Sequence, residues 1–343
     1  MKKIGMGVIG AGIMGNYHAR VYSELEKTQL IAIADLVEER AKKLAKKYGA
    51  KKIYTDYQKL INDPQVEAVS VATPDFAHFR PVISCLEAGK HVLVEKPLTT
   101  DLEEANKIIE SARRSRVKLM VNYSHRWLPA YFQAHQVIEE GKIGEPVMSY
   151  TRKNDRIYVP TKMLSWAEKS SPAMFLSAHD IDLVRWYIKS EVEEVYANAV
   201  FRVLKNRGIN APDCIQAQVK FKNGAIATFE SAWIYPDTFP TMTDSFIEIV
   251  GTKGVIHLER KEEQMEIATE KSFQHPRNLL TFPIFGKLQG AFSLSLTHFV
   301  ESILEDSEPY VSGEEGREVT RILCAIHKSI EKREPVKLLP FSK

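Results

Sequence analysis

A glycine-rich turn near the N-terminus constrains the fold of this chain more than any other segment. The turn consists of Gly10, Ala11, Gly12, Ile13, Met14 and Gly15. An apolar run at residues 4–9 precedes it, and helical spacing at residues 17–25 follows it. Between a strand and a helix, glycines at this spacing allow a tight turn, the close approach of a pyrophosphate and helix–strand packing. The helix N-terminus also presents N–H groups to the phosphates. The pattern predicts a dinucleotide-binding turn, the alternative being a turn with a purely structural role.

Asp35 strengthens this interpretation and distinguishes between two cofactors. It lies twenty residues after Gly15, at the end of a second apolar run at residues 30–34. A carboxylate at this place accepts hydrogen bonds from the adenosine ribose. It would repel the ribose phosphate of NADP by roughly 4 kcal/mol at about 4 Å and an effective dielectric near 20. We therefore expect NAD rather than NADP. Arg40 would soften this preference if it turned toward the ribose, but it also fits the polar face of a charged helix at residues 37–47.

Length and composition exclude several classes of protein. The 343 residues are enough for two domains, and 47 Lys and Arg against 44 Asp and Glu give a net charge of only +3. We find no basic stripe with interleaved aromatic residues and no apolar run of membrane-spanning length, so we expect neither a nucleic-acid nor a membrane partner. The three cysteines, Cys85, Cys214 and Cys324, lack metal-ligand or redox spacing. Their sparse use is typical of a reducing compartment, and we expect a cytoplasmic protein.

The first third of the chain alternates strand and helix patterns. Apolar runs at residues 68–72, 91–94 and 118–121 predict further strands, separated by helical segments. One of these helices is predicted to begin after Thr100 and Asp101, with Glu103 as a capping partner. Repeated strand–helix units form parallel sheets covered on both faces. We therefore predict an α/β class protein whose residues 1–122 form a doubly wound Rossmann domain that binds NAD.

The pattern changes after about residue 192. Asn223 and Gly224 carry a strong hairpin signal, and residues 250–255 predict a second hairpin. We expect residues 123–343 to form an α+β domain with an open-faced, mostly antiparallel sheet that binds substrate. Helical spacing at residues 179–188, 294–304 and 319–330 would cover one face. A bare second face is a common association surface, so we expect a homodimer or homotetramer.

Two polar segments follow strands of the first domain, at the edge where ligands bind in this architecture. The first contains Thr73, Pro74 and His78, after the strand at residues 68–72. The second is Glu95, Lys96 and Pro97, after the strand at residues 91–94. From spacing alone, a surface ion pair beside a turn proline explains the second segment as well as a ligand site does.

Together with a later segment, these motifs resemble the Gfo/Idh/MocA oxidoreductases, which include glucose–fructose oxidoreductase and inositol dehydrogenases. The later segment comprises His179, Asp180, Ile181, Asp182 and Leu183, followed by Arg185 and Trp186. The resemblance covers most of the chain and implies a Rossmann domain followed by an open-faced α+β domain. It also implies hydride transfer between NAD(P) and a sugar-like hydroxyl, with Lys96 and His179 as catalytic residues. The cofactor-binding residues expected are Gly10, Gly12, Ile13, Met14, Gly15, Asp35, Thr73, Pro74, His78, Glu95 and Lys96.

Physical chemistry agrees with these two roles. Oxidation of a secondary alcohol needs a hydride acceptor and a proton acceptor. An ordinary imidazole has a pKa near 6.5 and is mostly neutral at pH 7, so His179 would serve as the acid/base. An ammonium holds the oxygen by a charge-assisted hydrogen bond, so Lys96 would polarise it. We expect an NAD-dependent dehydrogenase that oxidises a secondary hydroxyl of a sugar, sugar derivative or cyclitol. An NAD-dependent glycosidase using transient oxidation and a non-catalytic NAD or sugar sensor are the alternatives.

The sequence departs from the family at Phe175. Inositol-dehydrogenase-like members usually carry an aspartate at this position, four residues before the histidine. A phenylalanine accepts no proton, so another group substitutes, the substrate offers an apolar surface, or catalysis is impaired. The candidate polar contacts to substrate are Tyr123, Arg152, Lys153, Asn154 and Tyr235. No metal site is expected, because His179 and Asp182 have no evident third ligand.

Overall fold

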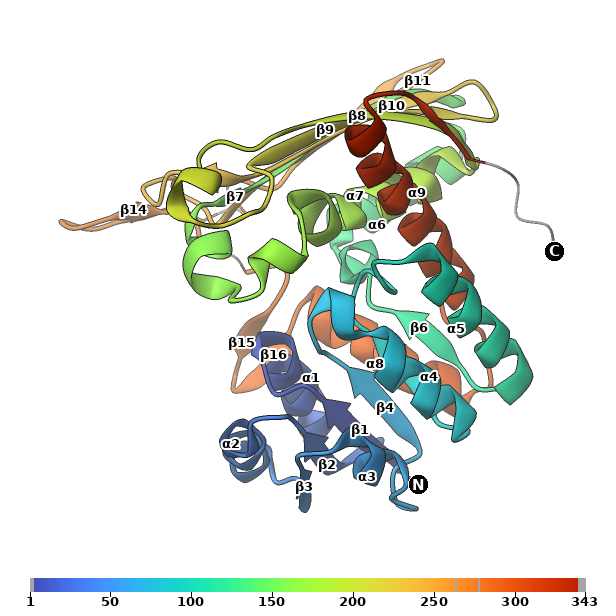
Figure 1. The fold of residues 1–343 in the computed structure, drawn as a ribbon, viewed down its shortest axis with the longest axis vertical. Helices are drawn as coiled ribbons and strands as arrows, with labels where there is room; N and C mark the ends of the chain where they lie inside the picture. The colour runs from blue at the N-terminus through green and yellow to red at the C-terminus, as the bar shows by residue number, and fades with distance from the viewer. Residues whose placement is uncertain (1–2, 262, 264, 277, 339–343) are drawn as a thin grey trace. The chain divides into compact units, whose positions relative to one another are not determined.

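The structure is a computed structural model that describes residues 3–261, 263, 265–276 and 278–338 (Figure 1). Its internal contacts divide the chain into two units. Unit 1 contains Met1–Trp127 and Leu280–Thr320, and unit 2 contains Leu128–Leu279 and Arg321–Lys343. The division predicted from sequence, 1–122 and 123–343, differs because residues 280–320 pack with the first unit.

A six-stranded sheet forms the centre of unit 1. Its order is β3-β2-β1-β4-β5-β6, and every neighbouring pair is parallel. The strands are β1 (Ile4–Ile9), β2 (Thr28–Ala34), β3 (Lys52–Tyr54), β4 (Ala68–Val71), β5 (His91–Val94) and β6 (Leu119–Val121). This is the doubly wound order of a Rossmann domain, and the direction of winding reverses between β1 and β4. The predicted fold class is therefore confirmed. Ligands of such sheets bind beyond the carboxyl ends of the strands at this reversal.

Helices cover both faces of this sheet. They are α1 (Ile13–Glu24), α2 (Glu38–Tyr48), α3 (Tyr57–Ile61), η1 (Asp75–Ala77), α4 (Phe79–Glu87), α5 (Leu102–Ser115), η2 (Ser124–Trp127), α8 (Ala291–Leu304) and the first part of α9 (Gly313–Lys332). A short hairpin, β15 (Phe282–Ile284) and β16 (Lys287–Gln289), precedes α8. Apolar residues of α1, α2 and α8 share one core cluster with β1 and β2. The cap of α5 differs in detail from the prediction, because Asp101 accepts the N–H of Glu104 at 2.9 Å rather than pairing with Glu103.

Unit 2 is built on a seven-stranded sheet of order β12-β11-β7-β10-β9-β8-β17. The strands are β7 (Pro146–Arg156), β8 (Val192–Val200), β9 (Cys214–Phe221), β10 (Ile226–Tyr235), β11 (Thr243–Gly251), β12 (Val255–Glu259) and β17 (Val336–Lys337). Only the β7–β10 pair is parallel, so the sheet is mostly antiparallel. Both predicted hairpins are present: β9 and β10 flank Asn223 and Gly224, and Val250 lies opposite Val255.

Helices pack on one face of this second sheet. They are α6 (Pro129–Glu139), α7 (Ala178–Ile188) and the last part of α9, and Figure 1 shows them on the same side. The remaining short elements of unit 2 are η3 (Val159–Met163), η4 (Ala167–Lys169), η5 (Ala173–Ser177), η6 (Lys205–Arg207), β13 (Ile267–Ala268) and β14 (Phe273–Gln274). Along β9, buried Ile215, Ala217 and Val219 alternate with exposed Gln216, Gln218 and Lys220. Within unit 2, no helix of the described residues covers the face that carries the exposed set.

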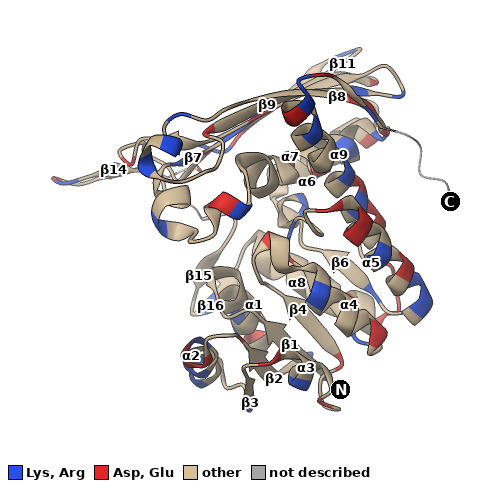
Figure 2. Ribbon diagram, in the orientation of Figure 1, with Lys and Arg blue, Asp and Glu red and all other residues tan. Residues whose placement is uncertain are grey.

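Charged residues are mixed rather than segregated. In the ribbon of Figure 2, basic and acidic residues are interspersed along α2, α5 and α9. Among the described residues, no helix is long and apolar enough to cross a bilayer.

Candidate functional site

The glycine-rich turn joins β1 to α1, and a different physical reason explains the glycine at each of its three positions. Gly10 has a φ of 98°, and a Cβ there would lie 2.6 Å from the carbonyl oxygen of Ala72. A Cβ on Gly15 would overlap the carbonyl oxygen of Gly10. A Cβ on Gly12 would meet no described atom within 4 Å. The chain itself therefore requires Gly10 and Gly15, whereas the open space at Gly12 suits the approach of a ligand from outside.

The N-terminus of α1 and the carboxylate of Asp35 border this open space. Gly12 is the N-cap of α1, and no described side chain caps the helix. Asp35 Oδ2 accepts the N–H of Ala11 at 2.7 Å, and Oδ1 accepts the N–H of Val37 at 2.8 Å. These two bonds hold the carboxylate beside the turn, where the ribose of a dinucleotide would lie. The residues present therefore fit NAD: the helix N-terminus for its pyrophosphate and Asp35 for its adenosine ribose.

Two loops at the carboxyl ends of β4 and β5 are joined by a buried imidazole. His78 Nδ1 lies 2.8 Å from the carbonyl oxygen of Pro97, and His78 Nε2 lies 3.0 Å from that of Thr73. Burial lowers the pKa of His78, with neighbouring Asp75 opposing the shift. His78 therefore contacts both loops from inside unit 1, whereas Thr73 and Pro74 are half-buried at the edge.

The segment after β5 places one charged residue inside and the next outside. Glu95 is buried, and its Oε1 accepts hydrogen bonds from His18 and Asn122. Lys96 is half-buried, whereas every other residue from Val92 to Thr99 is buried. Lys96 is therefore the residue that this buried segment directs toward the ligand-binding edge of the sheet.

In unit 2, Phe175 on η5 and His179 on α7 are two half-buried residues in a buried stretch of the chain. From Ser171 to Val184 all other residues are buried, and these two are half-buried at a spacing of four residues. Phe175 packs in an apolar cluster, with its ring centroid 6.2 Å from Trp166 and 6.5 Å from Trp233. The position four residues before His179, where the resemblance implies an aspartate, is therefore occupied by an aromatic side chain of this cluster.

Lys153 lies in the interior of unit 2. Its ammonium donates to Asp180 Oδ1, which it contacts closely, and to Ser245 Oγ at 3.1 Å. Burial outweighs the attraction within the pair, so the pKa of Lys153 lies below its ordinary value and the pKa of Asp180 lies above. Because Asp180 follows His179 on α7, this pair ties β7 to the helix that carries the histidine.

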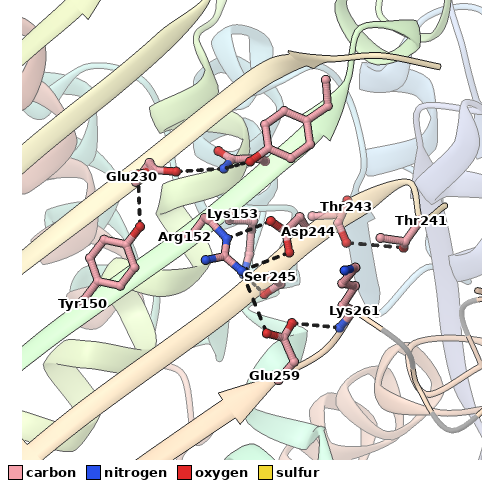
Figure 3. Close-up of polar contacts among 12 residues, drawn as sticks. Tyr150, Arg152, Lys153, Glu230, Thr241, Thr243, Asp244, Ser245, Glu259 and Lys261 are labelled. Atoms are coloured by element: carbon pink, nitrogen blue, oxygen red, sulfur yellow. Dashed lines mark hydrogen bonds and ion pairs between the residues drawn. The ribbon is translucent and has the colours of Figure 1, made fainter. Parts of the chain in front are cut away.

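The other unit 2 candidates lie on the opposite face of β7, since successive side chains of a strand alternate. Figure 3 shows Arg152 directed toward Asp244 and Glu259, and its Nε donates to Asp244 Oδ2 at 2.7 Å. Asn154 Nδ2 donates to Tyr235 Oη and to Glu230 Oε1, at 2.9 Å each.

The structure thus brings some candidates together and separates others. Arg152, Asn154 and Tyr235 share one polar cluster, whereas Lys153 belongs to the buried pair with Asp180. Tyr123 is buried in unit 1, just after β6. Sequence reasoning assigned no functional role to His18, Asn122 or Ser295; His18 and Asn122 donate to Glu95, and Ser295 donates to Asn122. The only sequence feature that pointed to them was the position of Glu95, a charged residue between an apolar strand and Pro97.

The three glycines generate a prediction about NAD affinity and folding. Gly12→Ala adds a methyl group into open space, so we expect an unchanged melting temperature and a much weaker affinity for NAD. Gly15→Ala strains the turn itself, so we expect both quantities to fall. Calorimetric NAD titration and thermal unfolding measure the two effects. Equal NAD affinities of Gly12→Ala and the parent would contradict the assigned pyrophosphate position.

Comparison with known proteins matches two consecutive family models to this chain. The GFO_IDH_MocA model, an oxidoreductase family with an NAD-binding Rossmann fold, matches residues 4–123, and the model of its C-terminal alpha/beta domain matches residues 135–338. A myo-inositol 2-dehydrogenase of Thermotoga maritima is 30% identical over 337 residues, covering 97% of this chain and 98% of the relative.

Two further matches agree with this result. A scyllo-inositol 2-dehydrogenase (NAD(+)) of Bacillus subtilis is 28% identical and covers 96% of this chain and 95% of the relative. The crystal structure of scyllo-inositol dehydrogenase from Lactobacillus casei with NAD(H) and scyllo-inositol has the same fold, with a TM-score of 0.85 at 22% identity, covering 98% and 99% of the two chains. This chain therefore belongs to the Gfo/Idh/MocA family of oxidoreductases and carries its NAD-binding Rossmann domain.

Proposed function

We propose that the protein is an NAD-dependent dehydrogenase that oxidises a secondary hydroxyl of a sugar, sugar derivative or cyclitol. The observation that carries the proposal is the placement of Lys96, the one half-buried residue of a buried segment at the ligand-binding edge of the Rossmann sheet. The relatives named as inositol 2-dehydrogenases support the substrate class.

Lys96 and His179 have complementary roles in this proposal, and they belong to separate units. Bound NAD supplies the hydride acceptor at nicotinamide C4. The Lys96 ammonium holds the substrate oxygen by a charge-assisted hydrogen bond and stabilises negative charge as it develops. The neutral imidazole of His179 accepts the hydroxyl proton and returns it in the reverse direction.

The cofactor residues divide into those that touch NAD and those that hold the loops. We assign the pyrophosphate to Gly12 and to the N–H groups of the first turn of α1, which contains Ile13, Met14 and Gly15. Asp35 binds the ribose, and half-buried Thr73 and Pro74 border the dinucleotide. Buried His78 and Glu95 belong to the second group, because their hydrogen bonds hold the loops that contain Thr73 and Lys96.

The substrate proposal includes an apolar surface. Phe175 and Trp166 form an aromatic wall, and Phe175 lies four residues before His179 in the chain. We infer that the substrate turns C–H groups or an apolar substituent toward this wall. Of the predicted polar contacts, Arg152, Asn154 and Tyr235 lie on the helix-free face of the unit 2 sheet, opposite the face that carries α7. We therefore keep only Tyr123 as a proposed polar contact to a substrate at His179. Lys153, buried against Asp180, would act through that carboxylate rather than by contact.

We also propose that the protein works in the cytoplasm as a homodimer or homotetramer. All three cysteines lie in the described chain and none forms a disulfide.

Side chains on the helix-free face of the unit 2 sheet include exposed Met148, Ile226 and Val255. If this face is buried against a second copy of the chain, sedimentation equilibrium should show a dimer or tetramer. Ile226→Lys places a charge on that face, so the variant should dissociate into monomers. A monomeric parent would refute the association.

The catalytic assignment predicts large losses of turnover. General acid–base and charge-stabilising groups are each worth about 10²–10⁴-fold in rate, so Lys96→Ala and His179→Ala should lose at least about 100-fold in kcat. NAD affinity should stay close to that of the parent protein, as measured by calorimetry. Parent-like turnover of both variants on the true substrate would contradict the assignment.

A substrate panel tests the reaction class and the aromatic wall. Cyclitols, aldoses and alkyl or aryl glycosides are followed by NADH absorbance, with NADP in parallel. We expect NADH formation, with glycosides preferred over free cyclitols. Phe175→Asp should shift kcat/KM by about tenfold toward cyclitols, equivalent to about 1.4 kcal/mol, whereas Phe175→Leu should not. Release of free sugar without NADH would instead indicate a glycosidase.

A further inference from the structure

We propose that a buried chain of side chains, His18–Glu95–Asn122–Ser295, positions the Glu95 carboxylate as a fixed counter-charge for Lys96. The inference rests on the proposed function, in which Lys96 binds the substrate oxygen as an ammonium. His18, Asn122 and Ser295 are positioning residues, because they act through Glu95. All of these residues belong to unit 1.

The chain of contacts is continuous and closed to solvent. Glu95 Oε1 accepts from His18 Nε2 at 2.9 Å and from Asn122 Nδ2 at 2.7 Å. Ser295 Oγ lies 2.9 Å from Asn122 Oδ1, to which it donates. The exposed fractions are 0% for His18, 6% for Glu95, 1% for Asn122 and 0% for Ser295. The four residues come from α1, the residue after β5, the residue after β6 and α8; His18 and Asn122 hold the carboxylate directly, and Ser295 holds Asn122.

The hydrogen-bond partners orient the Asn122 amide, and the Ser295 hydroxyl also lies 3.1 Å from the carbonyl oxygen of Phe292. Because Asn122 Oδ1 accepts from Ser295, the Asn122 amide N–H groups face Glu95. His18 Nδ1 is buried and has no hydrogen-bond partner among the described residues. The bond to the Glu95 carboxylate requires a proton on Nε2, so His18 donates through Nε2. Glu95 therefore receives two N–H donors on Oε1.

The carboxylate is ionised, and Lys96 follows it directly in the chain. Burial acts to raise the pKa of Glu95, but the bonds from His18 and Asn122 and the electrostatic attraction of His18 and Lys96 outweigh burial and lower the pKa. The same attraction favours the charged form of the Lys96 ammonium. A buried carboxylate left unpaired would be costly, so the donors keep Glu95 in place while Lys96 remains at the edge of the sheet.

Other titratable groups around this chain do not replace that charge. Tyr22 on α1 donates to or accepts from Ser70 at 2.7 Å, and burial raises its pKa. Burial lowers the pKa of His78, which lies between the Thr73 and Pro97 carbonyls. Tyr22 is therefore neutral near pH 7, and Asp75 is a further carboxylate near His78.

The first test measures the charge of Lys96 without NAD. Lysines are reductively methylated with ¹³C-formaldehyde, and the Lys96 signal is identified by its loss in Lys96→Arg. Glu95→Gln keeps an oxygen for both donors but removes the charge. We expect the titration midpoint of Lys96 to fall by about one pH unit. Glu103→Gln, an exposed change on α5, should leave it unmoved because solvent and salt screen that charge. An unshifted midpoint in Glu95→Gln would overturn the inference.

The second test asks whether His18 acts through its N–H group. His18→Phe removes the donor and retains a ring, whereas His18→Gln retains a side-chain N–H. We expect kcat of His18→Phe to fall about tenfold, with NAD affinity within about twofold of the parent, and His18→Gln to recover most of the loss. Equal kcat values for the two variants, at matched melting temperatures, would refute a positioning role.

Different results would contradict the proposed function and the counter-charge role of Glu95. Full turnover by Lys96→Ala would defeat the proposed function itself. An inactive Lys96→Ala combined with an unshifted Lys96 midpoint in Glu95→Gln would defeat only the counter-charge.

Discussion

The close packing of Gly15 against the carbonyl of Gly10 is the constraint on which the rest of unit 1 depends. It allows α1 to begin directly after β1, so the helix N-terminus faces the edge where β4 and β5 also end. Parallel strands direct their carboxyl ends to the same edge, and the loops with Asp35, Thr73 and Lys96 therefore gather there. A single backbone contact thus determines both the cofactor position and the neighbourhood of the proposed catalytic lysine.

In unit 2, the alternation of side chains along β7 places one buried charged residue on one face of the sheet and polar residues on the other face. Lys153 on β7 meets Asp180 on the helix-covered face, while Arg152 and Asn154 join Asp244 and Glu230 on the other face. The buried pair is enclosed and joins a strand to the helix that carries His179. A buried ion pair broken on one side leaves an unpaired charge, so this link is sensitive to loss of either partner.

Much of the architecture was predictable from local patterns. The strands at residues 4–9 and 91–94 were predicted at their observed bounds, because their apolar runs are bordered by a glycine turn and by Glu95. β3 escaped prediction, because its three residues are all half-buried and include Lys52. The placement of α8 in unit 1 was also missed, since its apolar face fits either sheet equally well by periodicity.

The sequence by itself determined the Rossmann turn, the preference of Asp35 for NAD, and the family motifs that contain Lys96 and His179. These features are local, since each depends on residue types at short, regular spacing. The tertiary structure alone decided which buried groups surround Glu95. His18 lies 77 residues from Glu95 in sequence, and Ser295 lies 173 residues from Asn122. No periodicity spans such separations, because only the packing of α1 and α8 on the sheet brings these hydrogen bonds together.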